Sequence, residues 1–178
     1  DREALAGLAV GAAVVVPTVT RPRFAGNPFR LGVASGYPTP DSVVLWTRLA
    51  VDPRVSDGGI DPVAVPVHWE IARDEAMRDV VRSGVAAATP EWAHSVHVVA
   101  DGLEPSRWYW YRFTAGDAQS PVGRTRTAPA AREMPGPLRF VVASCQHYEF
   151  GFYGAWRHAV ADAPDLVVFL GDYIYGGS

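Results

Sequence analysis

The stretch LEPSRWYWYRFTAG (Leu103–Gly116) decides the fold of the first part of the chain. Its aromatic run begins after a proline turn and ends at a glycine, as a β-strand does. VPVHWEIARD (Val65–Asp74) alternates apolar and polar residues, which is typical of a strand with one buried face. Two further runs of this kind are SVVLWTRL (Ser42–Leu49) and SVHVVADGL (Ser95–Leu103). Short strands at this spacing, with no convincing helix before about Thr127, predict a β-sandwich.

One pattern inside the opening stretch makes this prediction more specific. Leu103-x-Pro105-x-x-x-Tyr109-x-Tyr111 resembles the entry to the sixth strand of fibronectin type III domains. There a tyrosine hydroxyl bonds back to the upstream backbone as a tyrosine corner, and we assign that role to Tyr109. The alternative is an ordinary aromatic strand. We also expect the core to contain at least half of four strand tryptophans, Trp46, Trp69, Trp108 and Trp110.

After a Pro- and Gly-rich stretch (Thr127–Pro137) the hydrophobic pattern changes. LRFVVASCQ (Leu138–Gln146) and LVVFLGDYIY (Leu166–Tyr175) contain continuous apolar runs, as strands of parallel sheets do. Between them, Phe152–Pro164 predicts a short helix that ends at its proline. The whole segment therefore reads as a βαβ unit. Two parallel strands form no core of their own, so the unit must belong to a larger sheet.

Composition excludes several classes of function. A net charge of -3 gives no electrostatic reason to bind nucleic acid or an anionic membrane. All 16 basic residues are arginine, which excludes the P-loop lysine, Schiff-base chemistry and the kinase ATP lysine. Serine-hydrolase and HExxH motifs are also absent from the sequence.

The apolar segment Ala4–Val16 follows Arg2 and is too short to span a bilayer. Its hydrophobicity and its Gly and Ala content are typical of the central region of an export signal, and a buried N-terminal helix is the alternative. We predict export to the periplasm, the cell wall or the medium. A twin-arginine route suits this composition, although the paired arginines are not in the sequence.

Residues able to bind metal end both apolar runs of the βαβ unit. Cys145, the only cysteine, ends the first run, and Asp172 ends the second, with Tyr175 three residues later. The carboxyl ends of adjacent parallel strands meet in one crevice, where open α/β sheets bind their ligands. Gly171 allows a sharp turn at the strand end. A thiolate, a carboxylate and a phenolate together favour a trivalent metal such as iron(III), whose charge keeps the phenol ionised.

Taken together, these stretches make the chain resemble the alkaline phosphatase D (PhoD-like) family of metallophosphoesterases. The matching stretches are LGVASGYPTPDSVVLWTRL (Leu31–Leu49), VVASCQHYEFGFYGAWRHAV (Val141–Val160) and LVVFLGDYIYGG (Leu166–Gly177). Purple acid phosphatases share the GDxxY motif and an upstream β-sandwich, but they carry aspartate at the position of Cys145. The family usually has asparagine where this chain has His147.

The resemblance implies a role for each candidate ligand. Cys145 would be the thiolate ligand of iron(III), Asp172 the carboxylate that bridges iron to calcium, and Tyr175 the phenolate on iron. The implied cofactors are Fe3+ and Ca2+, and the implied reaction is hydrolysis of phosphate esters by metal-activated water. No catalytic residue is assigned beyond these ligands. The remaining ligands are expected downstream, so the 178-residue chain alone is predicted to be inactive.

The sequence thus predicts a mostly-β chain: a fibronectin type III-like β-sandwich followed by the first βαβ unit of an α/β metallophosphoesterase domain. The expected parts are a signal-like segment and linker (1–26), the sandwich (27–128), a linker (129–137) and the truncated start of the phosphatase domain (138–178). We expect a monomer whose partner is a phosphate ester, with no nucleic-acid scaffold role and no stable membrane span. The alternative function is a fibronectin-like binding or adhesion module without catalysis.

Overall fold

The computed structural model describes residues 22–134 and 136–176. Strands make up 39% of the chain and helix 6%, which confirms the predicted mostly-β class. The signal-like segment Ala4–Val16 lies outside the described residues. None of the described helices has the length and hydrophobicity needed to cross a bilayer.

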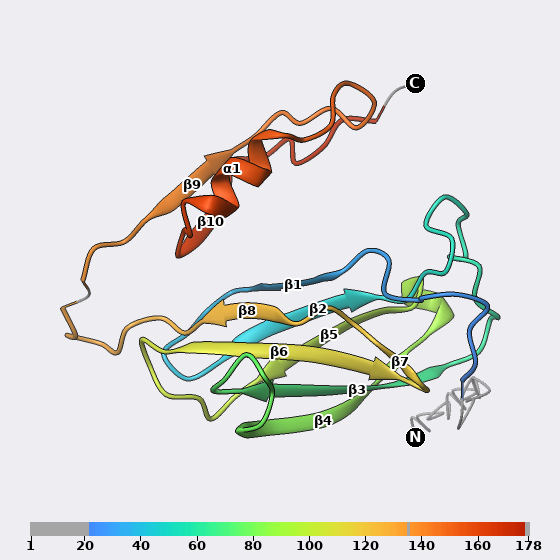
Figure 1. Ribbon diagram of the computed structural model, residues 1–178, viewed down its shortest axis with the longest axis horizontal. Helices are drawn as coiled ribbons and strands as arrows, with labels where there is room; N and C mark the ends of the chain where they lie inside the picture. The colour runs from blue at the N-terminus through green and yellow to red at the C-terminus, as the bar shows by residue number, and fades with distance from the viewer. Residues whose placement is uncertain (1–21, 135, 177–178) are drawn as a thin grey trace, which may run out of the picture.

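Two sheets of antiparallel strands form the sandwich (Figure 1). The smaller sheet has the order β1 (Val33–Gly36), β2 (Val43–Arg48) and β5 (Ser95–Ala100). The larger has the order β4 (Val80–Ala88), β3 (Val65–Ala72), β6 (Trp108–Ala115) and β7 (Ala118–Gln119), and β8 (Gly123–Arg126) also pairs with β6. A 3-10 turn (Pro90–Trp92) precedes β5. The fibronectin type III-like sandwich predicted from the sequence is therefore confirmed.

Alternating residues of the central strands fill the space between the sheets. β6 turns Tyr109, Tyr111 and Phe113 inward, and each is no more than 2% exposed. The same alternation places Trp108 and Trp110 on the outer face of β6, where they are half-buried. Among the four strand tryptophans, only Trp69 packs against the buried core. The expectation that at least half of them fill the core is therefore wrong, because the tyrosines occupy the inward positions.

Tyr109 forms the predicted tyrosine corner. The backbone N–H of Glu104 donates a hydrogen bond to the Tyr109 hydroxyl at 2.8 Å. The Thr127 hydroxyl closes the same end of the sandwich, because it donates to the Glu104 carbonyl at 2.7 Å and accepts from the Arg107 N–H at 3.0 Å. The corner thus ties the chain before β6 to the chain after β8.

The remaining residues form a small parallel unit. β9 (Phe140–Ala143) pairs in parallel with β10 (Leu166–Phe169), and α1 (Ala155–Ala161) connects them. The βαβ unit predicted from the hydrophobic runs is present, with a helix shorter than the predicted Phe152–Pro164 segment. In Figure 1 the unit extends along one side of the sandwich and is joined to it by the linker at one end. The predicted domain limits 27–128, 129–137 and 138–178 stay predictions.

Candidate metal centre

The carboxyl ends of β9 and β10 bring the three predicted ligands together. The Tyr175 hydroxyl lies 3.6 Å from the Cys145 Sγ, and that Sγ lies 3.9 Å from Oδ2 of Asp172. Cys145 and Asp172 come two and three residues after the last paired residues of their strands, Ala143 and Phe169. Residues 30 positions apart in the sequence therefore meet because the two strands are parallel and in register.

The backbone around the site explains how the side chains are aimed. Gly171 has φ 108°, the sharp turn that its position at the strand end predicts, and Cys145 and Asp172 have φ 56° and 43°. These are left-handed values that residues other than glycine rarely adopt. Such conformations cluster at functional sites, where the surrounding structure holds them in place.

Backbone hydrogen bonds hold the two loops beside each other. The N–H of Tyr175 donates to the Gln146 carbonyl at 2.6 Å, and the N–H of Tyr148 donates to the Tyr175 carbonyl at 2.9 Å. Trp156 on α1 contributes its ring N–H to the Gln146 side-chain oxygen at 2.5 Å. The loop that carries Cys145 is thus fastened both to the loop that carries Tyr175 and to the helix.

The electrostatics of the trio favour a bound cation. The Asp172 carboxylate, and after it the Cys145 thiol, raise the pKa of Tyr175 above its ordinary value. Without a cation the phenol therefore stays protonated, because its ionised form would face the Asp172 carboxylate. A positive ion between the three groups reverses this effect and favours their ionised forms.

The spacing and the donor types fit a metal ion. Two donor atoms, each about 2.0–2.3 Å from one transition-metal ion, lie about 3.0–3.6 Å from each other, close to the observed separations. Sulfur and oxygen donors of this kind suit iron better than magnesium or calcium alone. All three side chains are exposed at the edge of the sheet. The described residues contain no cluster of three or more His, Cys, Asp and Glu, so the site is found only when the tyrosine is counted.

His147 lies beside the trio. Its ring stacks on Phe150 with centroids 4.0 Å apart and lies 6.5 Å from the ring of Tyr175. Its ring nitrogen Nδ1 accepts the Glu149 N–H at 3.2 Å. These contacts give it a structural role in the loop after β9. The sequence pattern had offered no signal for this stack.

Comparisons with known proteins agree with this arrangement. A model of the N-terminal domain of PhoD-like phosphatases matches residues 14–129, and a model of PhoD-like phosphatase matches residues 140–178. The chain is 55% identical to alkaline phosphatase D of Bacillus subtilis (strain 168) over 154 residues, which cover 86% of this chain and 26% of that protein. It is 31% identical to purple acid phosphatase 15 of Arabidopsis thaliana over 83 residues, 44% of this chain and 15% of that protein.

A solved structure, described as the structure of PhoD, superposes with a TM-score of 0.80 at 55% identity. The match covers 86% of this chain and 29% of that one. The chain thus spans between a quarter and a third of the length of these two PhoD relatives. One family model covers more than half of the chain, and a second covers most of the rest. The chain belongs to the PhoD-like phosphatase family.

Proposed function

We propose that this chain supplies the N-terminal sandwich and the first metal ligands of an exported, metal-dependent phosphate ester hydrolase. The observation that carries the proposal is the convergence of Cys145, Asp172 and Tyr175 at the ends of two parallel strands. Membership of a phosphatase family and the identity to a protein named alkaline phosphatase D support the reaction class. The apolar segment Ala4–Val16 supports export.

The chain's own residues would divide the work of holding two cations. Cys145 and Tyr175 face each other and would bind Fe3+ as thiolate and phenolate, while the carboxylate of Asp172 has a second oxygen for Ca2+. When bound, the cations would neutralise charge on the phosphate and activate a water molecule. None of the three side chains would need to act as a nucleophile. A monomeric state, like the choice of these two ions, stays a prediction from the sequence.

The proposal is tested on the protein expressed from its coding sequence to the stop codon. Hydrolysis of p-nitrophenyl phosphate and bis(p-nitrophenyl) phosphate is measured with added Fe3+ and Ca2+, and again after chelation. We expect hydrolysis of at least one probe, loss on chelation, and recovery when both ions are returned. A protein that hydrolyses neither probe under any metal condition would contradict the proposal and favour a binding or adhesion module.

Matched variants connect the activity to the site. Asp172→Asn removes the charge of the proposed bridge while it preserves size, and we expect a fall in kcat of about 100-fold or more. Asp117→Asn makes the same change at an exposed turn between β6 and β7 and should leave kcat unchanged. Equal effects of the two variants would show that Asp172 has no special role.

The 178-residue chain provides a separate test of the expectation that it lacks some of the metal ligands. Assayed alone with both ions, it should show no turnover above background, because three ligands hold metal weakly without their partners. Turnover equal to that of the protein expressed to its stop codon would contradict the expectation that ligands are missing.

A further inference from the structure

The sandwich and the βαβ unit meet through one ion pair. Nη1 of Arg126, the last residue of β8, lies 2.6 Å from Oδ1 of Asp165, the residue before β10. Their side chains are 30% and 15% exposed, which makes this the most buried ion pair among the described residues. Within those residues it is also the only hydrogen bond or ion pair that joins the sandwich to the βαβ unit.

Asp165 connects this pair to the sheet that carries the metal ligands. Its second oxygen, Oδ2, accepts the backbone N–H of Arg139 at 3.0 Å, and its own N–H donates to the Arg139 carbonyl at 2.8 Å. Arg139 directly precedes β9 and Asp165 directly precedes β10, so this carboxylate joins the entrances of the two parallel strands. The Arg139 N–H is the leading cause of the lowered pKa of Asp165, which keeps this carboxylate ionised near neutral pH.

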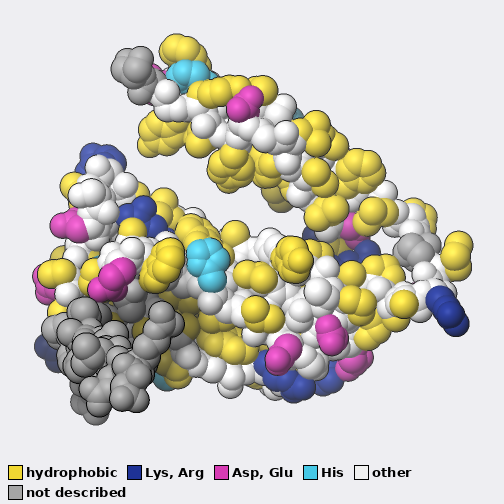
Figure 2. Space-filling view, turned by 180° about the vertical axis from the view of Figure 1, so that it is seen from behind, with side chains coloured by type: hydrophobic (Ala, Val, Ile, Leu, Met, Phe, Trp, Pro, Cys, Tyr) yellow, Lys and Arg dark blue, Asp and Glu magenta, His cyan; other side chains and the backbone are white. Residues whose placement is uncertain are grey.

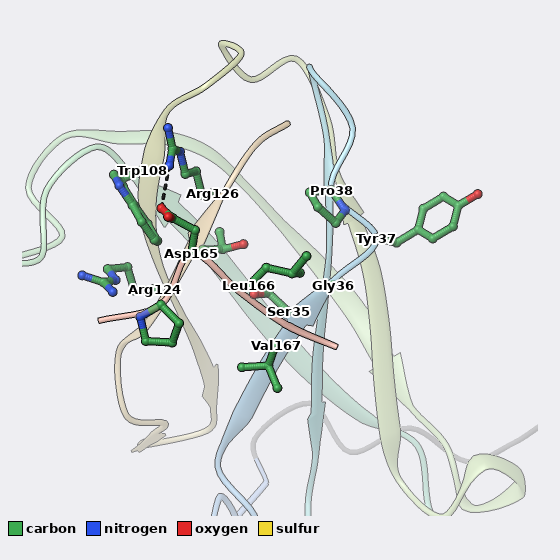
Figure 3. Close-up of a pocket in the computed structure, with 12 residues that line it drawn as sticks. Ser35, Gly36, Tyr37, Pro38, Trp108, Arg124, Arg126, Asp165, Leu166 and Val167 are labelled. Atoms are coloured by element: carbon green, nitrogen blue, oxygen red, sulfur yellow. Dashed lines mark hydrogen bonds and ion pairs between the residues drawn. The ribbon is translucent and has the colours of Figure 1, made fainter. Parts of the chain in front are cut away.

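Trp108 holds the arginine in position. Trp108 and Arg126 are opposite each other in the pairing of β6 with β8, and the Arg126 guanidinium lies 5.5 Å from the indole centroid. Arg124, two residues earlier on the same strand, lies over the same ring at 4.2 Å. Figure 3 shows the two arginines about Trp108, with Arg126 bonded to Asp165. Among the described residues Arg124 forms no ion pair, although it lies closer to the indole than Arg126 does.

Little else fastens the two units. A cavity of about 360 Å³ lies between them and is lined by residues of β1, β8 and the start of β10, among them Ser35 and Val167. In Figure 2 a channel separates the two units over much of their length and narrows toward the linker end. No strand of the described sandwich packs extensively against β9, β10 or α1. Apolar burial between the units is therefore small, and a partly buried, charge-assisted hydrogen bond is more important than an exposed one would be.

We propose that Arg126 and Asp165 form an interdomain clamp that fixes the βαβ unit on the sandwich and sets the direction of β10. Asp165 stands at the amino end of this strand, and Asp172 follows its carboxyl end. The two residues of the clamp are positioning residues, because the length of β10 separates them from the proposed metal centre. The clamp does not depend on the proposed function, since it concerns only how the two units are held.

Nuclear magnetic resonance relaxation of the 178-residue chain tests the clamp without an activity assay. Backbone ¹⁵N relaxation reports the rotational correlation time of each unit. In the unaltered chain the amides of β3, β6, β9 and β10 should share one correlation time. In Arg126→Ala the β9 and β10 amides should lose this common value and tumble faster, while the sandwich keeps its chemical shifts. An unaltered common value in this variant would overturn the proposal.

Arg124→Ala is the matched control, because it removes the other cation from the same indole. It should keep the common correlation time, and equal loosening in both arginine variants would assign the docking to the Trp108 stack instead. Asp165→Asn retains an oxygen for the Arg139 N–H but removes the charge, so it should loosen the units as Arg126→Ala does. If the sandwich and the βαβ unit stayed docked in Asp165→Asn, the ion pair would not be the interaction that holds them together.

The double variant Arg126→Ala/Asp165→Asn distinguishes a coupled pair from two independent effects. Coupling predicts that it loosens the units no more than either single change does. Additive loosening would overturn the clamp. If the single changes shift β9 and β10 to random-coil values, Arg126→Lys decides: partial return of the native shifts supports the clamp, and no return contradicts it.

Discussion

The backbone N–H of Cys145 donates a hydrogen bond to the carbonyl oxygen of Asp172 at 2.8 Å. Both residues have positive φ, so the two loops leave their strands in the same unusual conformation and stay paired. The same pairing brings the two side chains together, and the Cys145 Sγ donates a hydrogen bond to Asp172 Oδ2 at 3.9 Å. Changes to these side chains should therefore alter metal binding more than they alter the fold.

The first prediction concerns colour. Phenolate and thiolate ligands on iron(III) absorb visible light, so addition of Fe3+ to the 178-residue chain should produce a visible band, weak in proportion to the weak binding expected. Tyr175→Phe should remove the phenolate part of the band, and Cys145→Ala should shift it. Tyr173→Phe is the matched control, because that ring packs on Phe169 with centroids 4.4 Å apart and is not one of the proposed ligands. Loss of the band in the control alone would contradict the ligand assignment.

The second prediction concerns the tyrosine corner. Tyr109→Phe removes the acceptor of the Glu104 N–H and leaves that donor without its partner beside a residue that is 1% exposed. We expect the free energy of unfolding to fall by about 0.5–1.5 kcal/mol, the usual net contribution of one hydrogen bond, because this bond is only partly buried. Chemical denaturation measures this. Tyr37→Phe, at a residue that is 83% exposed, should change stability little, and equal losses would deny the corner a special role.

Alkaline pH provides the third prediction. Burial raises the pKa of Tyr111 from 10.0 to about 12, so the folded protein favours the neutral phenol. Its contribution to stability is complete below pH 10, where the phenol is neutral in both states, and is lost as pH rises from 10 toward 12. Each pKa unit corresponds to about 1.4 kcal/mol, which gives a total of roughly 2–3 kcal/mol.

Denaturation curves at several pH values between 9 and 12 test this dependence. Tyr111→Phe should flatten the decline in stability over that interval, since phenylalanine has no proton to lose. The stability of the Tyr37→Phe variant should decline with pH as steeply as that of the unaltered chain. If stability declined with pH equally in Tyr111→Phe and in the unaltered chain, the decline could not be attributed to ionisation of Tyr111.

The fourth prediction concerns close packing between β6 and β8. A Cβ added at Gly123 would overlap the ring of Tyr111, which is 2% exposed. Gly123→Ala should therefore lower the free energy of unfolding by about 1–3 kcal/mol, as overpacking of a core does. At Gly36 an added Cβ meets no atom within 4 Å, so Gly36→Ala should be nearly neutral. Thermal unfolding of both variants separates steric overlap from a general effect of glycine replacement.

Local pattern predicted four of the eight described strands of the sandwich, namely β2, β3, β5 and β6. Val65–Asp74 alternates apolar and polar residues, Trp108–Gly116 is an aromatic run bounded by turn residues, and β3 and β6 lie within these ranges. β4 (Val80–Ala88) was missed because its run VVRSGVAAA contains small and polar residues with weak alternation. The wrong expectation that at least half of the four strand tryptophans fill the core has a related cause. Alternation tells which residues share a face, but only the neighbouring sheet decides which face of β6 is buried.

The candidate site also has features that the sequence predicted and features that only the structure revealed. The types and positions of Cys145, Asp172 and Tyr175 predicted a metal centre, and the parallel pairing of β9 with β10 brings the three together. The contact of His147 with Phe150 and the pairing of Arg126 with Asp165 had no sequence signal. Each joins side chains whose approach depends on loop conformation or on how two separate units dock.

The sequence by itself determined four strands of the sandwich, the tyrosine corner and the three candidate ligands, because each depends on residue type and short-range spacing. The tertiary structure alone decided which face of each strand is buried, how closely the ligands approach, and where the sandwich touches the βαβ unit. The physical reason is distance along the chain. Contacts such as Arg126 with Asp165, 39 residues apart, depend on the summed geometry of every element between them.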